Sequence, residues 1–369
     1  MLVLNNDDLK SVLDMKTAME EVERAYLELF QGDATCMPRC NVELPTKDPG
    51  KKYALGVTSG GSSVSGYLTI RIQSDVTYEH EYAGVRTREK YAVHPGQWCG
   101  LYLLFDAQSG EPLAIMNEGY LQHLRQGADG GIGAKYMARE NAEVLGMLGS
   151  GGMAYTHAPA ICQARNIKKM KVFSPTREHR ETYAKEMAEL LGIEVEPVDE
   201  AKKAHEGVDI IATCTDSPAP VIFGKWLEKG THIVYAAGPV DQDGADLVDV
   251  SLRLGNTPTP LGKDWHERSD TVVWAAPALV RTEAASRSGT ATRGAARGVI
   301  RPEREIFLKD LLEGKVKGRT GAQQITFSDR GGMRGVEHNA VAAKAYELAK
   351  ARGLGHEIPT EWFLQNIRD

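Results

Sequence analysis

The spacing of apolar residues changes along the chain and predicts regions of different structure. Near the N-terminus, apolar residues recur every three or four positions from Met15 to Leu29, with charged residues between them, and Gly32 follows. This spacing predicts an amphipathic helix that ends at the glycine. From about 35 to 115, apolar residues form short runs separated by turn signals, at 53–57, 67–72 and 100–105. These runs predict a mainly antiparallel sheet, whereas the polar and aromatic stretch 76–98 lacks a clear period and predicts a long loop.

The middle of the chain alternates between short apolar runs and helical patterns. One helical pattern, at 120–138, leads into this region, and another, at 177–191, is closed by Gly192. Apolar runs that predict strands lie at 144–148, 171–174, 194–198, 208–213, 231–236 and 271–274. Strands that alternate with helices predict βαβ units and a parallel sheet.

Together the patterns predict an α/β protein with two domains. The parallel sheet is expected to form a central Rossmann-type domain over 129–324. The antiparallel sheet belongs to a second, α+β domain over 1–128. A terminal helical pattern at 339–352 would be marginal in isolation, so the segment 325–369 is expected to pack back on this second domain, which is therefore split.

The first strand of the central region runs into a glycine-rich turn at 149–154, Gly-Ser-Gly-Gly-Met-Ala, before a helix-compatible segment. In this G-x-G-x-x-A spacing the first glycine allows a tight turn, the second lets the backbone approach a pyrophosphate, and the alanine allows close helix packing. The helix N-terminus offers free N–H groups to phosphate. The turn predicts a dinucleotide site, although an ordinary glycine-rich strand–helix turn has a similar pattern. Its candidate cofactor contacts are Gly149, Ser150, Gly151, Gly152 and Met153.

The end of the next strand bears on the choice of cofactor. NAD-selective domains place an acidic residue there to hold the ribose hydroxyls. This chain has Ser174, Thr176 and Arg177 instead, and Arg177 could meet a 2′-phosphate. The pattern favours NADP over NAD, unless Arg177 only begins the following helix on its solvent face. Thr213 and Thr215, at the end of a later strand, are candidate contacts to the nicotinamide ribose.

Composition and charge exclude several classes of protein. The 369 residues are 42% apolar and 25% charged, and their net charge of −6 argues against nucleic acid as a partner. No apolar run is long enough to span a membrane, and the acidic N-terminal residues do not resemble a signal peptide. Five scattered cysteines indicate reduced thiols and a cytoplasmic location. Cys36 and Cys40 lack a second pair or a nearby histidine, so no metal site is expected.

Several short segments follow one another in an order and spacing that resemble the ornithine cyclodeaminase/μ-crystallin family. They are Met-Pro-Arg at 37–39, the strand and turn at 101–112, Leu-Arg-Gln-Gly-Ala at 124–128, the glycine turn with the segment 171–180, and the late segments 298–303 and 318–320. The resemblance implies a split substrate domain, a central Rossmann domain and a homodimer built through the substrate domains. It also implies hydride transfer between nicotinamide and the carbon of a C=N or C–N bond next to a carboxylate.

The substrate that this resemblance implies needs a cationic partner for its carboxylate, and arginine binds carboxylates in a bidentate manner. Motif matching implies that Arg125 and Arg39 hold the carboxylate, although either could form a structural ion pair instead. Where the family usually has a lysine, this chain has Arg71. Because an arginine stays charged, Arg71 would hold an anion or polarise an oxygen and would be a poor acid or base. Alternatively, it is a strand residue that faces solvent.

The candidates for proton transfer match the family's motifs less closely than the arginines do. The family's cyclodeaminases use an aspartate after the glycine of the fifth strand as proton acceptor for the amine. In this chain Asp241 lies one residue from the matching position, Val240, so it either reaches the site or is a solvated turn carboxylate. Among several histidines and tyrosines, His123 is preferred, because it shares a helical face or turn with Arg125 and can transfer protons near neutral pH.

The sequence therefore predicts an NAD(P)-dependent oxidoreductase that reduces a small imine with at least one carboxylate or oxidises the matching amino acid. Three inward arginines would suit a substrate with two anionic groups. One alternative is a redox-neutral cyclodeaminase of ornithine or a related diamino acid, which needs a carboxylate such as Asp241 for the distal amine. The other is a non-catalytic NADP-binding protein, as the crystallin relatives illustrate.

Overall fold

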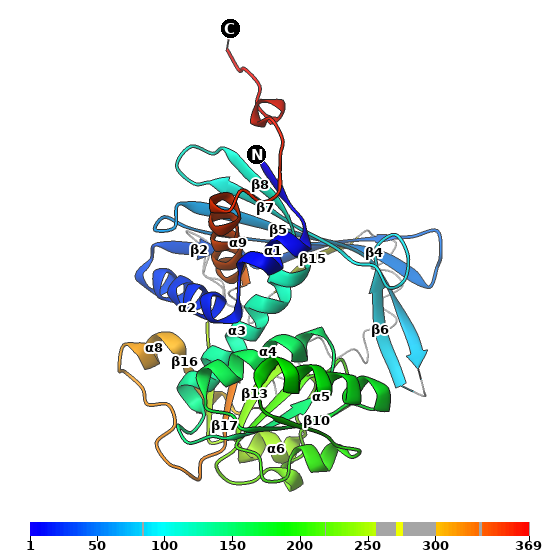
Figure 1. Ribbon diagram of the computed structural model, residues 1–369, viewed down its shortest axis with the longest axis vertical. Coiled ribbons are helices and arrows are strands. Elements are labelled where there is room, and N and C mark those ends of the chain that lie inside the picture. The colour runs from blue at the N-terminus through cyan, green and yellow to red at the C-terminus, as the bar shows by residue number, and fades with distance from the viewer. Residues whose placement is uncertain (83–84, 218, 256–270, 276–299, 332–333, 369) are drawn as a thin grey trace. The chain divides into compact units, whose positions relative to one another are not determined.

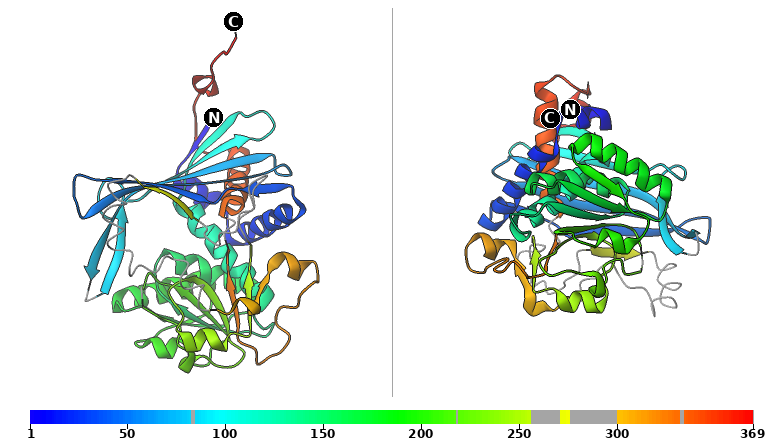
Figure 2. Two further views of the ribbon diagram at one scale, coloured as in Figure 1. Left: turned by 180° about the vertical axis from the view of Figure 1, so that it is seen from behind. Right: turned by 60° about the horizontal axis from the view of Figure 1, so that its bottom comes forward.

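The computed structural model describes residues 1–82, 85–217, 219–255, 271–275, 300–331 and 334–368, which divide into two compact units (Figures 1 and 2). The described part of unit 1 comprises 1–82, 85–125, 271–275 and 334–368. That of unit 2 comprises 126–217, 219–255 and 300–331. None of the described helices is long and apolar enough to cross a membrane.

Unit 1 is built on a ten-stranded sheet with the order β15-β3-β4-β5-β7-β8-β1-β18, in which β2 also pairs with β4 and β6 with β5. Its strands are β1 (Leu2–Leu4), β2 (Ala34–Cys36), β3 (Arg39–Pro45), β4 (Lys51–Ser62), β5 (Tyr67–Tyr82), β6 (Val85–Tyr91), β7 (Cys99–Asp106), β8 (Pro112–Asn117), β15 (Thr271–Ala275) and β18 (His356–Glu357). Neighbours are antiparallel except in the pairs β1–β8 and β15–β3.

The helices of unit 1 are α1 (Asn6–Val12), α2 (Met15–Gln31), α9 (Arg334–Ala351) and the short η5 (Thr360–Phe363), and α3 (Gly119–Met137) begins in this unit. As predicted, α2 is amphipathic. The Asp14 side chain caps its N-terminus, and Gly32 ends it with a φ of 91°. Helix α9 is joined to the sheet by a hydrogen bond of 3.0 Å between the side chains of Thr69 and Asn339.

Strand β5 has an inverted polarity that positions the site of unit 1. Its alternate residues Thr69, Arg71, Gln73, Asp75 and Thr77 are all buried. The residues between them, which include Ile70 and Ile72, are only partly buried. The polar face of β5 is therefore the buried face, and its apolar face is the more exposed one.

The prediction of a long loop over 76–98 is wrong for most of that stretch. Strand β5 continues to Tyr82, and β6 pairs with its second half in an antiparallel hairpin. Tyr78 and Tyr91 lie edge to face across the hairpin, 6.0 Å between ring centroids, and the Lys51 ammonium lies 5.5 Å from each ring. Cross-strand aromatic pairs stabilise such hairpins without an apolar alternation, so hydropathy did not reveal this one.

Unit 2 is built on an eight-stranded sheet with the order β11-β10-β9-β12-β13-β17-β14-β16, in which every pair is parallel. Its strands are β9 (Val144–Leu148), β10 (Lys169–Phe173), β11 (Glu194–Pro197), β12 (Ile210–Cys214), β13 (His232–Ala237), β14 (Val250–Arg253), β16 (Glu305–Phe307) and β17 (Thr326–Asp329). Its helices are α4 (Gly152–Ala164), α5 (Arg177–Leu191), α6 (Gln242–Leu247) and α8 (Leu308–Leu312), with the short η1 (Ala201–Ala204), η2 (Gly224–Trp226) and η4 (Pro302–Arg304).

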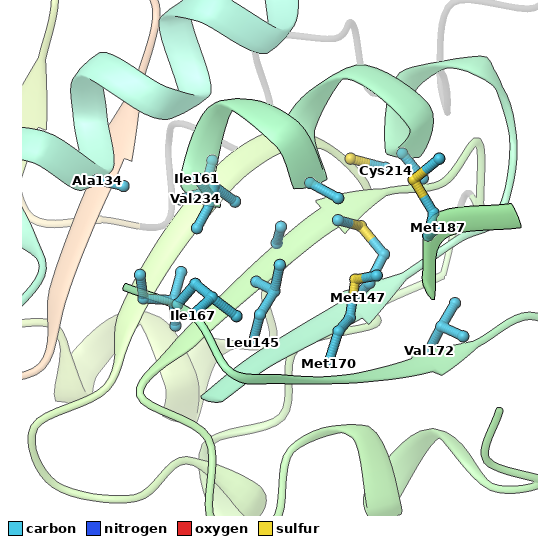
Figure 3. Close-up of a cluster of buried hydrophobic side chains, with 14 of the residues drawn as sticks. Ala134, Leu145, Met147, Ile161, Ile167, Met170, Val172, Met187, Cys214 and Val234 are labelled. Atoms are coloured by element: carbon cyan, nitrogen blue, oxygen red, sulfur yellow. The ribbon is translucent and has the colours of Figure 1, made fainter. Parts of the chain in front are cut away.

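The parallel sheet is buried on both faces, as expected for a Rossmann-type unit. One core contains Leu145, Met147 and Ile161, which Figure 3 shows with the neighbouring strands and helices. A second core contains Ile211 and Ile233. Because Ile210 and Ala212 belong to the first core and Ile211 to the second, β12 contributes alternate residues to each. The predicted fold class, with a parallel-sheet domain and an α+β domain, is confirmed.

The short strand predicted at 271–274 has a different partner from the one expected. It was assigned to the parallel-sheet domain, but Thr271–Ala275 forms β15 and pairs with β3 of unit 1. A short apolar run indicates a strand, and its partner is decided by contacts far away in the sequence.

Candidate functional site

The glycine-rich turn of unit 2 joins β9 to α4 and has two distinct glycine positions. Gly149 has a φ of 111°, and a Cβ there would overlap the carbonyl oxygen of Cys214 on β12. Gly151 precedes α4 with a φ of −89°, and a Cβ there would have no atom within 4 Å. The turn therefore needs Gly149 for its conformation, whereas Gly151 leaves open space beside the first N–H groups of α4. This arrangement fits a dinucleotide pyrophosphate.

The other predicted contacts around this turn differ in exposure. Ser150 and Met153 are partly buried, and Gly152 is exposed at the start of α4. Thr213 is fully buried, and its Oγ1 has no hydrogen-bond partner among the described residues. The Oγ1 of Thr215 accepts a hydrogen bond from the Ser217 amide at 3.2 Å. An unsatisfied buried hydroxyl costs free energy, so the Thr213 hydroxyl is the group at this strand end that is available to hydrogen-bond with a ligand or water.

The end of β10 carries the residues predicted to bind the adenosine. Ser174 is buried, and Thr176 is the N-cap of α5 without a side-chain capping bond. Arg177 begins α5 with a side chain that is 78% exposed, and its Nε donates to Glu181 at 2.6 Å. Arg180, which the sequence did not single out, donates to the Ser174 carbonyl at 3.0 Å. The region has no carboxylate at the strand end, and two arginines lie near it.

Asp241 caps a helix. It precedes α6, and its Oδ1 accepts hydrogen bonds from the Gly244 amide at 2.7 Å and the Gly224 amide at 2.9 Å. The carboxylate thus ties α6 to η2, which is a structural use that a turn aspartate commonly has.

A small cavity in unit 2 was not predicted from the sequence. It lies where β13 and β17 end, and it is lined by Gln126, Asp129, Gly130, His157, Val234, Tyr235, Ala236, Ser328, Asp329 and Arg330. Arg330 donates to the Gln126 side chain at 2.5 Å. Ligands of open parallel sheets bind at the carboxyl ends of strands. The polar sequence Ser328-Asp329-Arg330 directly after the strand-like residues Ile325-Thr326-Phe327 was the signal that could have revealed it.

In unit 1, Arg71 is buried on β5, so the alternative of a solvent-facing strand residue is wrong. Its side chain is 5% exposed. Its Nε donates to Glu118 Oε1 at 2.7 Å, and its Nη2 lies 2.6 Å from the same oxygen. Glu118 is fully buried and was missed by the sequence analysis. Burial raises the pKa of the Glu118 carboxyl, and the Arg71 guanidinium opposes this shift.

Arg125 is also paired with a buried carboxylate. Its Nη1 donates to Glu337 on α9, and its Nη2 donates to Gln122 at 2.9 Å. Glu337 is fully buried and accepts a second hydrogen bond, of 3.1 Å, from the Tyr26 hydroxyl. The structural ion pair that was left open for this arginine therefore exists.

Arg39 and Arg71 converge on one neutral acceptor. Both donate to Oε1 of Gln73, at 3.2 Å from Arg39 Nη2 and 2.9 Å from Arg71 Nη2. The Gln73 amide donates in turn to Asp75, which is buried. Burial raises the pKa of the Asp75 carboxyl, and the cations Lys90, Arg71 and Arg39 oppose the shift. The two guanidiniums are therefore neighbours, so an anion could contact both.

His123 lies in the same helix as Arg125, and it is partly buried. Two residues apart, they share a helical turn, which is one of the two arrangements expected, although their side chains face different sides of the helix. Burial lowers the pKa of His123, and the positive charges of Lys90 and Arg125 add to the effect. His123 is thus held in its neutral form near neutral pH.

The described residues contain no group of histidine, cysteine, aspartate and glutamate side chains that could hold a metal ion. Unit 1 offers buried guanidiniums that can bind a carboxylate, and unit 2 offers a dinucleotide turn. The arrangement within each unit fits one half of a nicotinamide-dependent reaction on a carboxylate-bearing molecule.

Comparisons with known proteins agree with these features. The family model described as the ornithine cyclodeaminase/mu-crystallin family matches residues 2–353. The chain is 27% identical over 369 residues to an alanine dehydrogenase of Archaeoglobus fulgidus, covering 97% of this chain and 98% of that protein. It is 30% identical over 261 residues to a Delta(1)-pyrroline-2-carboxylate reductase of Bacillus cereus, covering 70% of this chain and 74% of that protein.

Among solved structures, the Delta(1)-pyrroline-2-carboxylate reductase of Thermococcus litoralis, in complex with NADH and L-proline, is similar with a TM-score of 0.72 and 25% identity. The match covers 97% of this chain and 100% of that one. The chain therefore belongs to the ornithine cyclodeaminase/mu-crystallin family, and it is a nicotinamide-dependent oxidoreductase of that family.

Proposed function

We propose that the enzyme interconverts a small carboxylate-bearing imine and the corresponding amino acid. The observation that carries this proposal is the set of two buried arginines, Arg71 and Arg125, and the partly buried Arg39, in a chain that also has a dinucleotide turn. When bound, the nicotinamide supplies a hydride to the imine carbon or accepts one from the amine carbon. The protein residues bind and orient the substrate.

The arginines are assigned to the substrate carboxylate. Arg39 and Arg71 already meet at Gln73, so a carboxylate could bridge them. A fixed carboxylate orients the neighbouring carbon, and such orientation can lower a barrier by several kcal/mol. We assign proton transfer to His123, because its lowered pKa leaves it neutral and able to accept a proton. Asp241 keeps its role as the cap of α6.

For the cofactor, we assign the pyrophosphate to Gly149–Met153, the nicotinamide ribose to Thr213 and Thr215, and the adenosine to the end of β10, at Ser174 and Thr176. We favour NADP over NAD, because no carboxylate ends β10 and Arg177 is exposed beside it. The test is to titrate NADPH and NADH separately against the wild type and Arg177→Ala. Loss of NADPH affinity alone is the expected result, and unchanged NADPH affinity would refute the contact.

The activity itself is tested by following nicotinamide absorbance. The probes in the reductive direction are Δ1-pyrroline-2-carboxylate and pyruvate with ammonia, which correspond to the reactions that the relatives' names indicate. Turnover is expected with at least one imine, and it should fall at least about 100-fold in Arg39→Ala. No turnover above background with any imine would favour the non-catalytic alternative.

The cyclodeaminase alternative has its own signature. Ornithine would release ammonia without a net change in nicotinamide absorbance. This alternative needs a carboxylate for the distal amine, but the Asp241 carboxylate accepts two backbone hydrogen bonds instead. No specific observation therefore favours the cyclodeaminase. Ammonia release from ornithine by the wild type and its loss in Asp241→Asn would reverse this conclusion.

We also propose a homodimer and a cytoplasmic location. The dimer is supported by the partly exposed apolar face of the unit 1 sheet, which includes Ile72 and Leu101. The cytoplasmic location is supported by the five cysteines, all of which are free thiols.

A further inference from the structure

Glu118 forms a buried ion pair with Arg71 inside unit 1, and a backbone hydrogen bond fixes its position. It directly precedes α3, and its amide donates to the Gly100 carbonyl of β7 at 2.9 Å. Both Nε and Nη2 of Arg71 contact Glu118 Oε1, at 2.7 and 2.6 Å. Arg71 Nη2 also donates a hydrogen bond to Gln73 at 2.9 Å. The contacts with Glu118 and Gln73 together hold the Arg71 guanidinium in one orientation.

Gly100 makes room for this carboxylate. A Cβ at position 100 would overlap Oε2 of Glu118. Oε2 also has no hydrogen-bond partner among the described residues, although the side chain of Glu118 is fully buried. The second oxygen thus has no hydrogen-bond donor of its own, and the nearest compensating charge is Arg71, which contacts the other oxygen, with Arg125 and Lys90 adding to it.

Buried carboxylates reduce the net positive charge that the arginines present to a ligand. Arg71 is compensated by Glu118, and Arg125 by Glu337. Asp75 adds a third buried carboxyl, which accepts a hydrogen bond from the amide of Gln73, the residue at which the Arg39 and Arg71 guanidiniums meet. An anion that approaches Arg71 is attracted by the guanidinium and repelled by Glu118. One carboxylate can still bind, but a second finds little uncompensated positive charge.

We propose that Glu118 positions Arg71 and restricts the substrate to molecules with a single carboxylate. The proposal rests on the proposed function, in which Arg71 binds the substrate carboxylate. It replaces the expectation from the sequence that three arginines would suit a substrate with two anionic groups. The residue acts through Arg71, so it is a positioning and specificity-determining residue.

The test removes the charge of Glu118 and keeps its shape. In Glu118→Gln, the kcat/KM for L-aspartate relative to that for L-alanine should rise at least about tenfold, because repulsion of the second carboxylate is lost. Gly100→Ala, which would displace the Glu118 carboxylate, should change the ratio in the same direction. Glu111→Gln is the matched control, because it removes a glutamate charge from an exposed turn of the same unit.

Acidification should imitate the substitution. Glu118 faces Arg71 on β5, Lys90 on β6, Tyr102 on β7 and Arg125 on α3. Since burial raises the pKa of its carboxyl, protonation as the pH falls should raise the aspartate to alanine ratio of the wild type. In Glu118→Gln this pH dependence should disappear.

An equilibrium measurement separates this proposal from the proposed function. Binding of propionate and succinate to the wild type and to Glu118→Gln is measured by calorimetry. A succinate preference that rises about tenfold in the variant supports the proposal even if neither amino acid is oxidised. Equal preferences in the two proteins, or equal kcat/KM ratios, would overturn it, as would the failure of both anions to bind. Absence of turnover alone would count only against the proposed function.

Discussion

At the scale of single residues, two arginines of the candidate site form ion pairs with buried carboxylates, Arg71 with Glu118 and Arg125 with Glu337. An arginine stays ionised when buried, so a fold can bury it only with a compensating charge or a full set of acceptors. The sequence indicated Arg39, Arg71 and Arg125 through short motifs. It did not indicate Glu118, because nothing in the linear order of residues shows that a glutamate before α3 meets a strand 47 residues earlier.

The Arg125–Glu337 pair allows stability to be separated from function. Arg125→Met should lower the free energy of unfolding by about 3–5 kcal/mol, because it leaves a fully buried Glu337 without its cation. The double variant Arg125→Met with Glu337→Gln should recover most of that stability, since both charges are gone. Urea unfolding measures both values.

Activity should behave differently from stability in these variants. If Arg125 binds the substrate carboxylate, the double variant stays at least about 100-fold below the wild type in kcat/KM although it is stable. Recovery of activity together with stability would show that Arg125 has only the structural role.

At the scale of elements, the glycine turn contains one glycine that its conformation requires, Gly149, and another, Gly151, that borders open space. The G-x-G-x-x-A spacing and its flanking strand and helix were predictable, because they depend on local backbone geometry. The same local character explains why α2, α5 and the parallel strands β9 to β13 were predicted close to their observed positions, whereas the short strands β14, β16 and β17 were not predicted. The β5–β6 hairpin was missed because its pairs are polar and aromatic.

Substitutions at the two glycines should separate folding from cofactor binding. Gly149→Ala should lower the free energy of unfolding by at least about 1–2 kcal/mol, because φ is 111° and the new Cβ would overlap the Cys214 carbonyl. Gly151→Ala should change stability by less than about 0.5 kcal/mol but weaken NAD(P)H binding about tenfold, since its Cβ enters open space. Urea unfolding and nicotinamide fluorescence give the two readouts. Unchanged affinity in Gly151→Ala would place the pyrophosphate elsewhere.

A buried histidine on β13, His232, should make the stability of unit 2 sensitive to acid. His232 is fully buried and hydrogen-bonds with Thr326 at 3.0 Å and Ser328 at 3.2 Å. Burial lowers the pKa of His232 to about 3. The unfolded chain therefore binds a proton below about pH 6.5 that the folded chain does not, and stability is lost as the pH falls.

The size of this effect can be measured against a variant. Between pH 6.5 and 5, His232 should account for a loss of about 2 kcal/mol in the free energy of unfolding of unit 2. In His232→Gln that part of the loss should be absent, whatever the stability of the variant at pH 7. Parallel pH profiles for the two proteins would mean that His232 is accessible to protons in the folded state.

At the scale of the whole molecule, the division into an α+β unit and a parallel-sheet unit followed from the change in apolar spacing. The partner of β15 did not follow from it, because a strand of five residues carries no information about which sheet it joins. The sheet of unit 1 shows a second feature that hydropathy alone obscures. Its buried face is polar at β5, and its apolar face is the one left partly exposed.

That apolar face should be where two copies of the chain associate. Ile72 of β5 pairs with Leu101 of β7, and Ile70 pairs with Leu103, so their side chains lie on one face of the sheet. Leu101 is 37% exposed in the single chain, and an exposed apolar sheet face of this kind is typically covered by a partner. Leu101→Glu places a charge on this face without disturbing a filled core.

Light scattering coupled to size-exclusion chromatography should give the mass of a dimer for the wild type and of a monomer for Leu101→Glu. Leu190→Glu is the control, because Leu190 is 63% exposed on α5 of unit 2 and should not affect association. The free energy cost of burying an unpaired carboxylate in an apolar interface is several kcal/mol, enough to shift a micromolar dimer to monomer. A dimer that persists in Leu101→Glu would assign the interface to a different surface.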